Sequence, residues 1–102
     1  MYIERVRQVD SSESNESGLY DYYYEYDTYR FTEGTVCFVV RSYTDEPDEA
    51  HFLRVEESGN RRALTSGDLS HPLFHMAHDH LRGEGKVRIR WLSGKGNGYE
   101  SL

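Results

Sequence analysis

The chain has 102 residues, of which 36% are hydrophobic and 14% aromatic, and its formal charge is −6. That length suffices for one domain with a modest core. The acidic balance argues against non-specific nucleic-acid binding, which depends on neutralising phosphates, and the only cysteine, Cys37, excludes an intramolecular disulfide.

The chain carries no sequence signal for a membrane or for export. No apolar run approaches the roughly 20 residues that cross a bilayer. The first residues lack the basic, apolar and small-residue order of a signal peptide. Cys37 lies in the apolar run 36–40, where a buried thiol is the default. We therefore expect a cytoplasmic protein with a reduced cysteine.

The first segment of the chain has a short apolar pattern followed by a polar run. Ile3, Val6 and Val9 are the apolar residues of an expected strand over 3–9. Residues 10–18 are polar and acidic, which predicts a surface loop.

Tyrosine dominates the next segment, where six of the ten residues from 20 to 29 are Tyr. Side chains of a strand alternate between its two faces. A strand over 19–27 would therefore have one aromatic face and one acidic face. The aromatic face consists of Tyr20, Tyr22, Tyr24 and Tyr26, and the acidic face of Asp21, Glu25 and Asp27.

The aromatic pattern changes parity after Thr28, because Tyr29 and Phe31 stand at odd positions. A bulge or bend near Thr28 would absorb that change. A turn at 32–34 then leads to a third strand over 35–43, whose centre is apolar at both parities, as in a central strand.

A fourth strand is expected over 50–56, between an acidic turn at 45–49 and a second turn at 58–60. Its period-two pattern places His51, Leu53 and Val55 on one face.

One strong helix is predicted over 69–82, with Ser70 as its cap, Pro72 in its first turn and Gly83 after its end. Helical spacing gathers the apolar residues on one side, with His80 packed close to them. The apolar residues are Leu73, Phe74, Met76, Ala77 and Leu81, and the opposite side consists of His71, His75, His78 and Arg82.

A last strand over 86–92 has an apolar and a basic face, and a glycine-rich tail at 93–102 is expected to be flexible. Its apolar face is Val87, Ile89 and Trp91, and its basic face is Lys86, Arg88 and Arg90. The acidic face of the tyrosine strand is expected to be solvated, with pairing to this basic face on a neighbouring strand as the alternative. Residues 1–102 are thus expected to form one mostly β domain of four strands, a helix and a fifth strand, either a strongly bent sheet or a small barrel.

Part of this pattern resembles a known family. Leu19-Tyr20-Asp21-Tyr22 resembles the opening motif of SH3 domains, and residues 31–36 resemble the strand entry that follows it. The element order is also similar to Sm-like barrels, including a bacterial protein described as a variant of that fold. The SH3 resemblance implies a groove lined by Tyr20 and Tyr22, but the chain lacks the paired Trp and the P-x-x-Y segment that complete it.

The tyrosine face can either build the core or form a recognition surface, since Tyr is favoured at interfaces. As function we predict a non-enzymatic interaction module that binds a peptide or protein, including a second copy of itself. Tyr20, Tyr22, Tyr24 and Tyr26 would supply contact area, and the acidic face would favour a basic partner.

Two alternatives use other residues. An Sm-like protein would bind RNA through Lys86, Arg88, Arg90 and Trp91. A metal protein would use His71, His75 and His78, whose spacing places them on adjacent helical turns, although no H-E-x-x-H motif is present. Neither G-x-S-x-G nor a phosphate-loop motif occurs, and we expect no cofactor.

Overall fold

The protein, a computed structural model, is described over residues 1–12, 18, 22–93 and 99–101, the last three as backbone only. Among these residues no helix is long and apolar enough to cross a bilayer. The elements in chain order are β1 (Tyr2–Ser11), β2 (Tyr23–Glu33), β3 (Val36–Tyr43), β4 (Glu49–Glu57), β5 (Asn60–Arg62), the 3₁₀ turn η1 (Ser66–Ser70), α1 (Pro72–Gly83), β6 (Arg88–Leu92) and β7 (Tyr99–Ser101).

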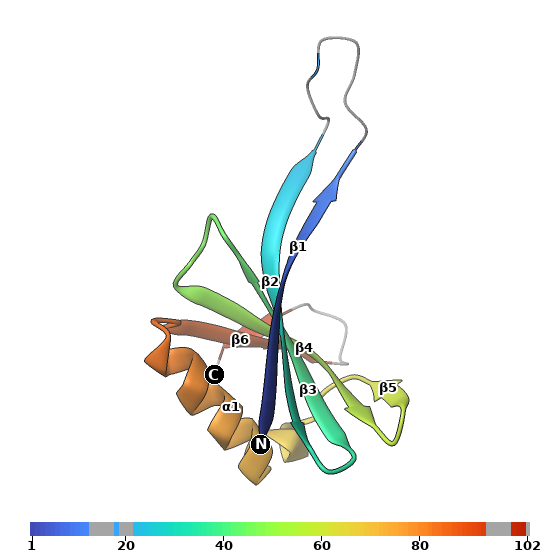
Figure 1. Ribbon diagram of the computed structural model, residues 1–102. Coiled ribbons are helices and arrows are strands. Elements are labelled where there is room, and N and C mark those ends of the chain that lie inside the picture. Colours follow the sequence, from blue (N-terminus) through green and yellow to red (C-terminus); the bar gives the residue numbers. More distant parts are fainter. Residues whose placement is uncertain (13–17, 19–21, 94–98, 102) are drawn as a thin grey trace.

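The strands form one open, mostly antiparallel sheet in the order β1-β2-β3-β4-β6-β7 (Figure 1). The chain winds antiparallel through β1 to β4, then crosses over through η1 and α1 to β6, which runs parallel to β4. β5 pairs with the end of β4, and β7 pairs with β6 inside the segment 93–102. The predicted bent sheet with a helix before its last long strand is confirmed. The barrel alternative is wrong, because the end strands β1 and β7 do not pair with each other.

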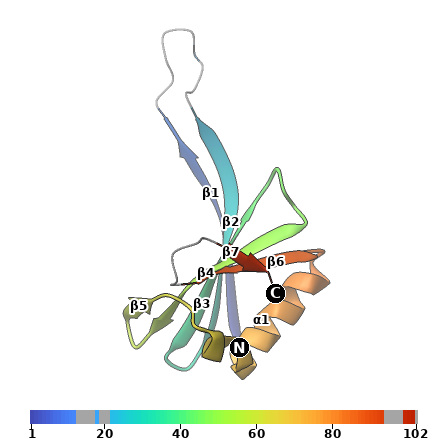
Figure 2. The same ribbon diagram turned by 180° about the vertical axis from the view of Figure 1, so that it is seen from behind.

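Helix α1 lies against one face of the sheet (Figure 2), and we call the opposite face the open face. The core fills the layer between α1 and the sheet, and much of it is aromatic. Phe38, Phe52 and Phe74 meet one another, with Phe52 and Phe74 ring centroids 4.5 Å apart. The remaining core residues are Tyr29, Phe31, Val40, Ala50, Val55, Leu64, Leu73, Ala77, Leu81, Ile89 and Trp91.

Strand β2 keeps a single parity along its length, so the predicted bulge at Thr28 is wrong. Its register with β1 and with β3 continues without a shift through Thr28. The odd residues of β2 therefore all lie on the side of the sheet that carries α1, and among them Asp27, Tyr29 and Phe31 are buried. The parity is unbroken because the acidic residues of this face find arginine partners on β1. Tyr29 and Phe31 then continue the same face into the core.

The irregularity of the sheet lies in β4 instead, at Leu53. Val39 pairs with Arg54 and Val40 pairs with Phe52, which leaves Leu53 without a direct partner across the ladder. This bulge turns both Phe52 and Val55 toward α1, where both are fully buried. The predicted shared face of His51, Leu53 and Val55 is therefore wrong for Val55.

Turns and helix caps follow local chemistry. Ser58 and Gly59 both have positive φ, 51° and 84°, as a two-residue hairpin turn requires. The helix begins later than predicted, after the separate turn η1. His71 caps it by accepting a hydrogen bond on Nδ1 from the backbone N–H of Leu73 at 3.0 Å, and Pro72 occupies the first helical position.

The predicted apolar faces of α1 and β6 hold with two exceptions. Met76 and Val87 are exposed, while the other apolar residues of the two predicted faces are buried. Val87 precedes β6 and does not share the alternation of Ile89 and Trp91. His80 is partly buried, and its ring lies edge-on to Phe31 with centroids 5.6 Å apart.

One end of the β1–β2 pair projects beyond the rest of the sheet (Figure 1). Pairing between β2 and β3 starts at Tyr26, so residues 23–25 of β2 pair with β1 alone. We call residues 9–11 and 22–25 the arm.

Candidate functional site

Exposed apolar side chains gather on β1 and the arm. Among the described residues, nine large hydrophobic side chains are exposed, and all but Met76 and Val87 lie in this part of the chain. Two packed layers would normally bury such residues, and exposed apolar patches are typical of interaction surfaces. The seven are Met1, Tyr2, Val6, Val9, Tyr22, Tyr23 and Tyr24.

Four tyrosines form a continuous row of ring contacts on the open face, which we call the tyrosine ladder. Tyr22 lies 6.0 Å from Tyr24, Tyr24 lies 5.9 Å from Tyr43, and Tyr43 lies 5.6 Å from Tyr26, measured between centroids. Tyr22 and Tyr24 are 47% and 52% exposed. Alternation places Tyr23, which is 51% exposed, on the other side of the same strand.

Arg41 of β3 extends along the inner end of the ladder. Its guanidinium lies 5.0 Å from the ring centroid of Tyr43 and 5.9 Å from that of Tyr26. Such cation–π contacts hold a flexible side chain in one place. The ladder therefore ends in a positioned positive charge.

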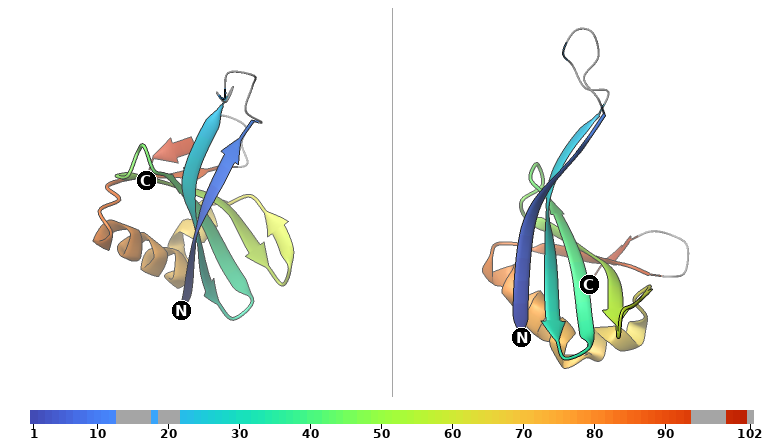
Figure 3. Two further views of the ribbon diagram at one scale, coloured as in Figure 1. Left: turned by 45° about the horizontal axis from the view of Figure 1, so that its top comes forward. Right: turned by 45° about the vertical axis from the view of Figure 1, so that its right-hand side comes forward.

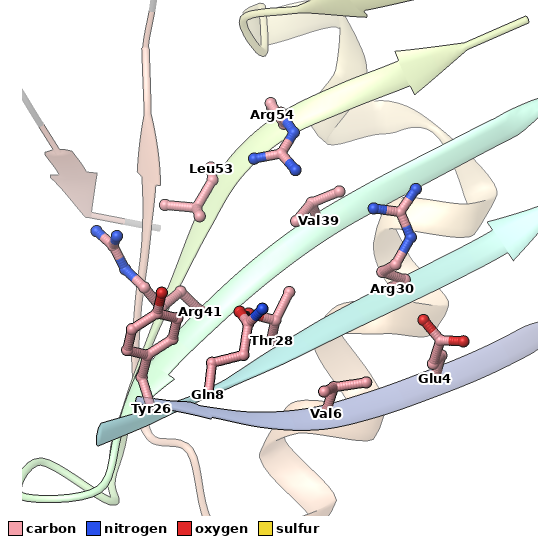
Figure 4. Close-up of a pocket in the computed structure, with 10 residues that line it drawn as sticks. All are labelled: Glu4, Val6, Gln8, Tyr26, Thr28, Arg30, Val39, Arg41, Leu53 and Arg54. Atoms are coloured by element: carbon pink, nitrogen blue, oxygen red, sulfur yellow. Dashed lines mark hydrogen bonds between the residues drawn. The ribbon is translucent and has the colours of Figure 1, made fainter. Parts of the chain in front are cut away.

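A hollow of about 310 Å³ adjoins the ladder on the open face (Figure 4). We call it the arginine hollow. Val6, Val39 and Leu53 supply its apolar surface, and Arg30, Arg41 and Arg54 are its basic lining residues. The bulge at Leu53 contributes directly, because it brings Leu53 to this face. The remaining lining residues are Glu4, Gln8, Tyr26 and Thr28.

Glu56 organises two of these arginines. Arg30 Nη2 donates to Glu56 Oε1 at 2.6 Å, and Arg54 Nε donates to Oε2 at 2.9 Å. The hydrogen bond from Arg30 is the main cause that lowers the pKa of Glu56 to about 2, with Arg54 adding to it against the effect of burial. One carboxylate thus orients two guanidiniums, and the hollow keeps a net positive charge.

Replacing Glu56 with Gln should lower the free energy of unfolding by roughly 1–3 kcal/mol at neutral pH. The carboxylate has a lower pKa in the folded state, so it stabilises the fold above the unfolded pKa near 4.5. That contribution is lost as the pH falls toward about 2. Urea denaturation from neutral to acid pH should show a flatter profile for Glu56→Gln. Glu57→Gln is the matched control, because Glu57 is exposed and makes a longer contact, 3.4 Å, with a guanidinium nitrogen of Arg62. Equal pH profiles for the two variants would contradict the stabilising role of Glu56.

An acidic corner lies on the other side of the ladder. A second hollow of about 290 Å³ is lined by Tyr24, Tyr43, Asp45, Glu46 and His51. Behind it, Glu49 contacts His51 Nε2 at 2.8 Å. The pKa of Glu49 is lowered chiefly by that contact, and the pKa of Glu46 is raised chiefly by its hydrogen bond with Glu49. The ladder therefore separates a basic hollow from an acidic one.

The predicted binding residues divide between the two faces. Tyr22, Tyr24 and Tyr26 share the open face, whereas Glu25 and Asp27 face the helix side, and Tyr20 and Asp21 lie outside the described residues. Asp27 accepts hydrogen bonds from Arg7 Nε at 2.6 Å and Arg5 Nη2 at 2.7 Å. Arg7 also bonds Glu25 at 2.7 Å.

These contacts correct two predictions. The cross-strand partners of Glu25 and Asp27 are Arg5 and Arg7 of β1, not the basic face of the last strand. The two carboxylates are thereby neutralised on the face opposite the ladder. They cannot select a basic partner for the tyrosines.

The residues predicted to bind RNA already make contacts within the fold. Trp91 is 8% exposed in the core. Buried Lys86 donates from Nζ to the backbone oxygen of Pro47 at 2.7 Å, and burial lowers its pKa. Arg88 pairs with Asp48 at 3.1 Å, and Arg90 lies 3.7 Å from Glu49.

The histidines of α1 do not converge. His71 caps the helix, His75 is exposed, and His78 is partly buried, its ring centroid 6.4 Å from that of Phe74. Burial lowers the pKa of His78. Within the described ranges no group of three or more His, Cys, Asp or Glu is placed to hold a metal ion. Cys37 is buried as predicted.

Comparisons with known proteins identify no relative. A scan of family models, a search of curated proteins and a search of solved structures each gave no match. The SH3-like and Sm-like resemblance of the sequence thus has no support from them. The sequence analysis did not single out Arg41 or Tyr43 as binding residues. One signal was present, because both stand at odd positions near the end of the predicted strand 35–43 and therefore share a face.

Proposed function

We propose that the protein is a non-enzymatic interaction module, which binds an extended segment of a protein partner across the open face. One observation carries this proposal. Tyr22 and Tyr24 are each about half exposed and so are not core residues, yet the ring of Tyr22 contacts that of Tyr24, and the ring of Tyr24 contacts that of Tyr43. Rigid, half-exposed tyrosines are typical of recognition surfaces, since each ring gives a large contact area at a low cost in side-chain entropy.

The charges beside the ladder indicate the chemistry of the partner. Arg30, Arg41 and Arg54 surround the arginine hollow, with Glu4 as its only acidic lining residue among those described. A carboxylate there would gain charge-assisted hydrogen bonds. Asp45 and Glu46 on the far side of Tyr43 favour a cation. We infer a partner segment with an acidic residue on one side of an aromatic or apolar residue and a basic residue on the other.

Replacing Tyr22 and Tyr24 together with Ser should abolish binding while leaving the fold intact. A random peptide library displayed on phage and selected on the immobilised full chain provides the measurement. We expect the wild type to enrich a shared motif and the double variant to enrich none. A hot-spot tyrosine typically contributes about 2 kcal/mol or more, so two should remove any moderate affinity.

Tyr23→Ser is the matched control for this experiment. Tyr23 stands between the two replaced residues with similar exposure but on the opposite face, so its loss should leave the enriched motif unchanged. Thermal unfolding of all three proteins separates binding from stability. Unfolding of the double variant, or equal loss of binding in Tyr23→Ser, would refute the role of the ladder.

The RNA and metal alternatives have less support. Sm-like RNA binding through Arg88 and Arg90 would require both side chains to leave their present acidic partners, and Trp91 to leave the core. A salt-dependent shift with single-stranded RNA that is lost in Arg88→Glu, Arg90→Glu would favour it. A metal site on His71, His75 and His78 would require rearrangement of the helix cap.

A further inference from the structure

Strand β1 is a long edge strand, and no strand in the described part of the chain pairs with its outer side. It spans ten residues, most of them exposed, and among the described residues it pairs with β2 alone. The right-hand view of Figure 3 shows it at the border of the row of strands. A bare edge of this length is a template for another strand, and its own side chains include exposed Tyr2, Val6 and Val9.

The usual protection of such an edge is weakened in this protein. Charged side chains, lysine above all, discourage pairing between edges. In β1, however, Arg5 and Arg7 both turn toward Asp27 of β2, which accepts hydrogen bonds from each. Their charges are thereby compensated inside one chain. The two arginines therefore do not prevent a further strand from pairing with this edge.

We propose that β1 pairs antiparallel with β1 of a second copy of this chain, joining two sheets into one across a two-fold axis. This goes beyond the proposed function, because it uses the sheet edge and not the tyrosine ladder. A two-fold axis perpendicular to the sheet keeps each face on its own side. It therefore requires one residue of β1 to face the same residue of the partner, and this condition selects the register.

The sequence of β1 favours Val6 at the axis. Centring on Glu4, Arg5 or Arg7 would place two like charges directly opposite each other, which destabilises an antiparallel pair. Centring on Val6 places two exposed apolar side chains together. It also pairs residues 2–10 of each copy, an overlap as long as that of the Arg7 register and longer than those of the Glu4 and Arg5 registers.

The other pairs in this register are complementary. On the open face, Glu4 faces the partner's Gln8, and Tyr2 faces the partner's Asp10, so each pair joins a hydrogen-bond donor to an acceptor. On the helix side, Ile3 faces the partner's Val9. Arg5 faces the partner's Arg7, and the two-fold axis repeats this like-charge pair on the other side of Val6, but each of these arginines is already bonded to an Asp27. Such a pairing also gives the arm, a two-stranded ribbon by itself, a third strand.

Sedimentation of the full chain tests the assembly. We expect a species of twice the 11.9 kDa chain mass. Val6→Lys should return it to the monomer, because two ammonium groups would meet at the axis. Val87→Lys is the control, since Val87 is also exposed, at 59%, but is not a residue of β1, and it should leave the dimer intact. A monomeric wild type at every concentration would overturn the proposal.

Disulfide trapping tests the register without relying on a destabilising variant. In a Cys37→Ala background, Val6→Cys should cross-link to itself on oxidation. Directly opposed Cα atoms lie about 4.5–5.5 Å apart, within the roughly 4.4–6.8 Å that a disulfide spans. Glu4→Cys mixed with Gln8→Cys should also cross-link. Tyr2→Cys alone should not, because the two copies of residue 2 would stand roughly 27 Å apart at about 3.4 Å per residue.

The outcomes separate this inference from the proposed function. A dimer that persists in Val6→Lys and fails to cross-link at Val6→Cys would have its interface elsewhere, and the edge proposal would be wrong. If Tyr22→Ser, Tyr24→Ser instead dissociates that dimer, the ladder is the self-association surface. If the edge proposal holds, the tyrosine variant remains a dimer whether or not it loses peptide binding.

Discussion

Phe52→Ala should destabilise the protein by about 3–5 kcal/mol, which is a large part of the roughly 5–15 kcal/mol that holds a small domain folded. Phe52 is fully buried where the sheet meets α1, with Phe74 at 4.5 Å and Phe38 at 6.2 Å between centroids. Truncation removes the ring on which both others pack. Urea denaturation followed by tryptophan fluorescence measures the loss, since Trp91 belongs to the same core.

Leu53→Ala is the matched control for that variant. Leu53 is the next residue of the same strand, but the bulge places it on the open face beside the arginine hollow. Its truncation should cost about 1 kcal/mol or less, because the side chain keeps contact with water. Comparable losses for Phe52→Ala and Leu53→Ala would contradict the bulge and the assignment of faces in β4.

The bulge also shows why the sequence predicts the elements of this fold better than their faces. Alternation in 50–56 places His51, Leu53 and Val55 together, and only the pairing of Val39 and Val40 with β4 reveals the shift. That pairing depends on the packing of Phe52 and Val55 against α1, which is a tertiary effect. A period-two sequence pattern does not reveal where a single residue is inserted into a strand.

The tyrosine strand was predicted more completely. Its two faces follow from parity alone, and the open face does carry Tyr22, Tyr24 and Tyr26. The sequence did not decide which face is buried. The answer depends on Arg5 and Arg7, which stand about twenty residues earlier and meet Asp27 only through the register of β1 with β2.

The candidate site could not be predicted from the sequence for the same reason. The arginine hollow takes its lining from four strands, with Glu4 on β1, Thr28 on β2, Arg41 on β3 and Arg54 on β4. Each of these residues looks like an ordinary exposed polar residue in its own segment. Only the relative registers of four strands, including the bulge, bring them together. The open edge of β1 is likewise visible only once the sheet is known not to close.

Asp27→Asn should lower the free energy of unfolding by roughly 2–3 kcal/mol. The Asp27 carboxylate is 5% exposed and accepts hydrogen bonds from both Arg5 and Arg7. The amide cannot offer four acceptor positions, and it leaves Arg5 with Glu84 and Arg7 with Glu25 as their remaining acidic partners. Because both arginines are about half exposed, water compensates part of the loss. This places the effect at the low end for a broken buried pair.

Glu25→Gln is the control, because Glu25 bonds the same Arg7 from a more exposed position and should contribute about 1 kcal/mol or less.

Acid titration gives a second readout. Burial alone would raise the pKa of Asp27, but the bonds from Arg7 and Arg5 outweigh it and the pKa is lowered. The wild type should therefore lose stability as the pH falls below the ordinary value near 3.9, and Asp27→Asn should lose less there. If both variants unfold alike, Asp27 is not what fixes β1 to β2. Because the same bonds compensate the charges of the β1 edge, Asp27→Asn should also weaken any dimer that forms through that edge.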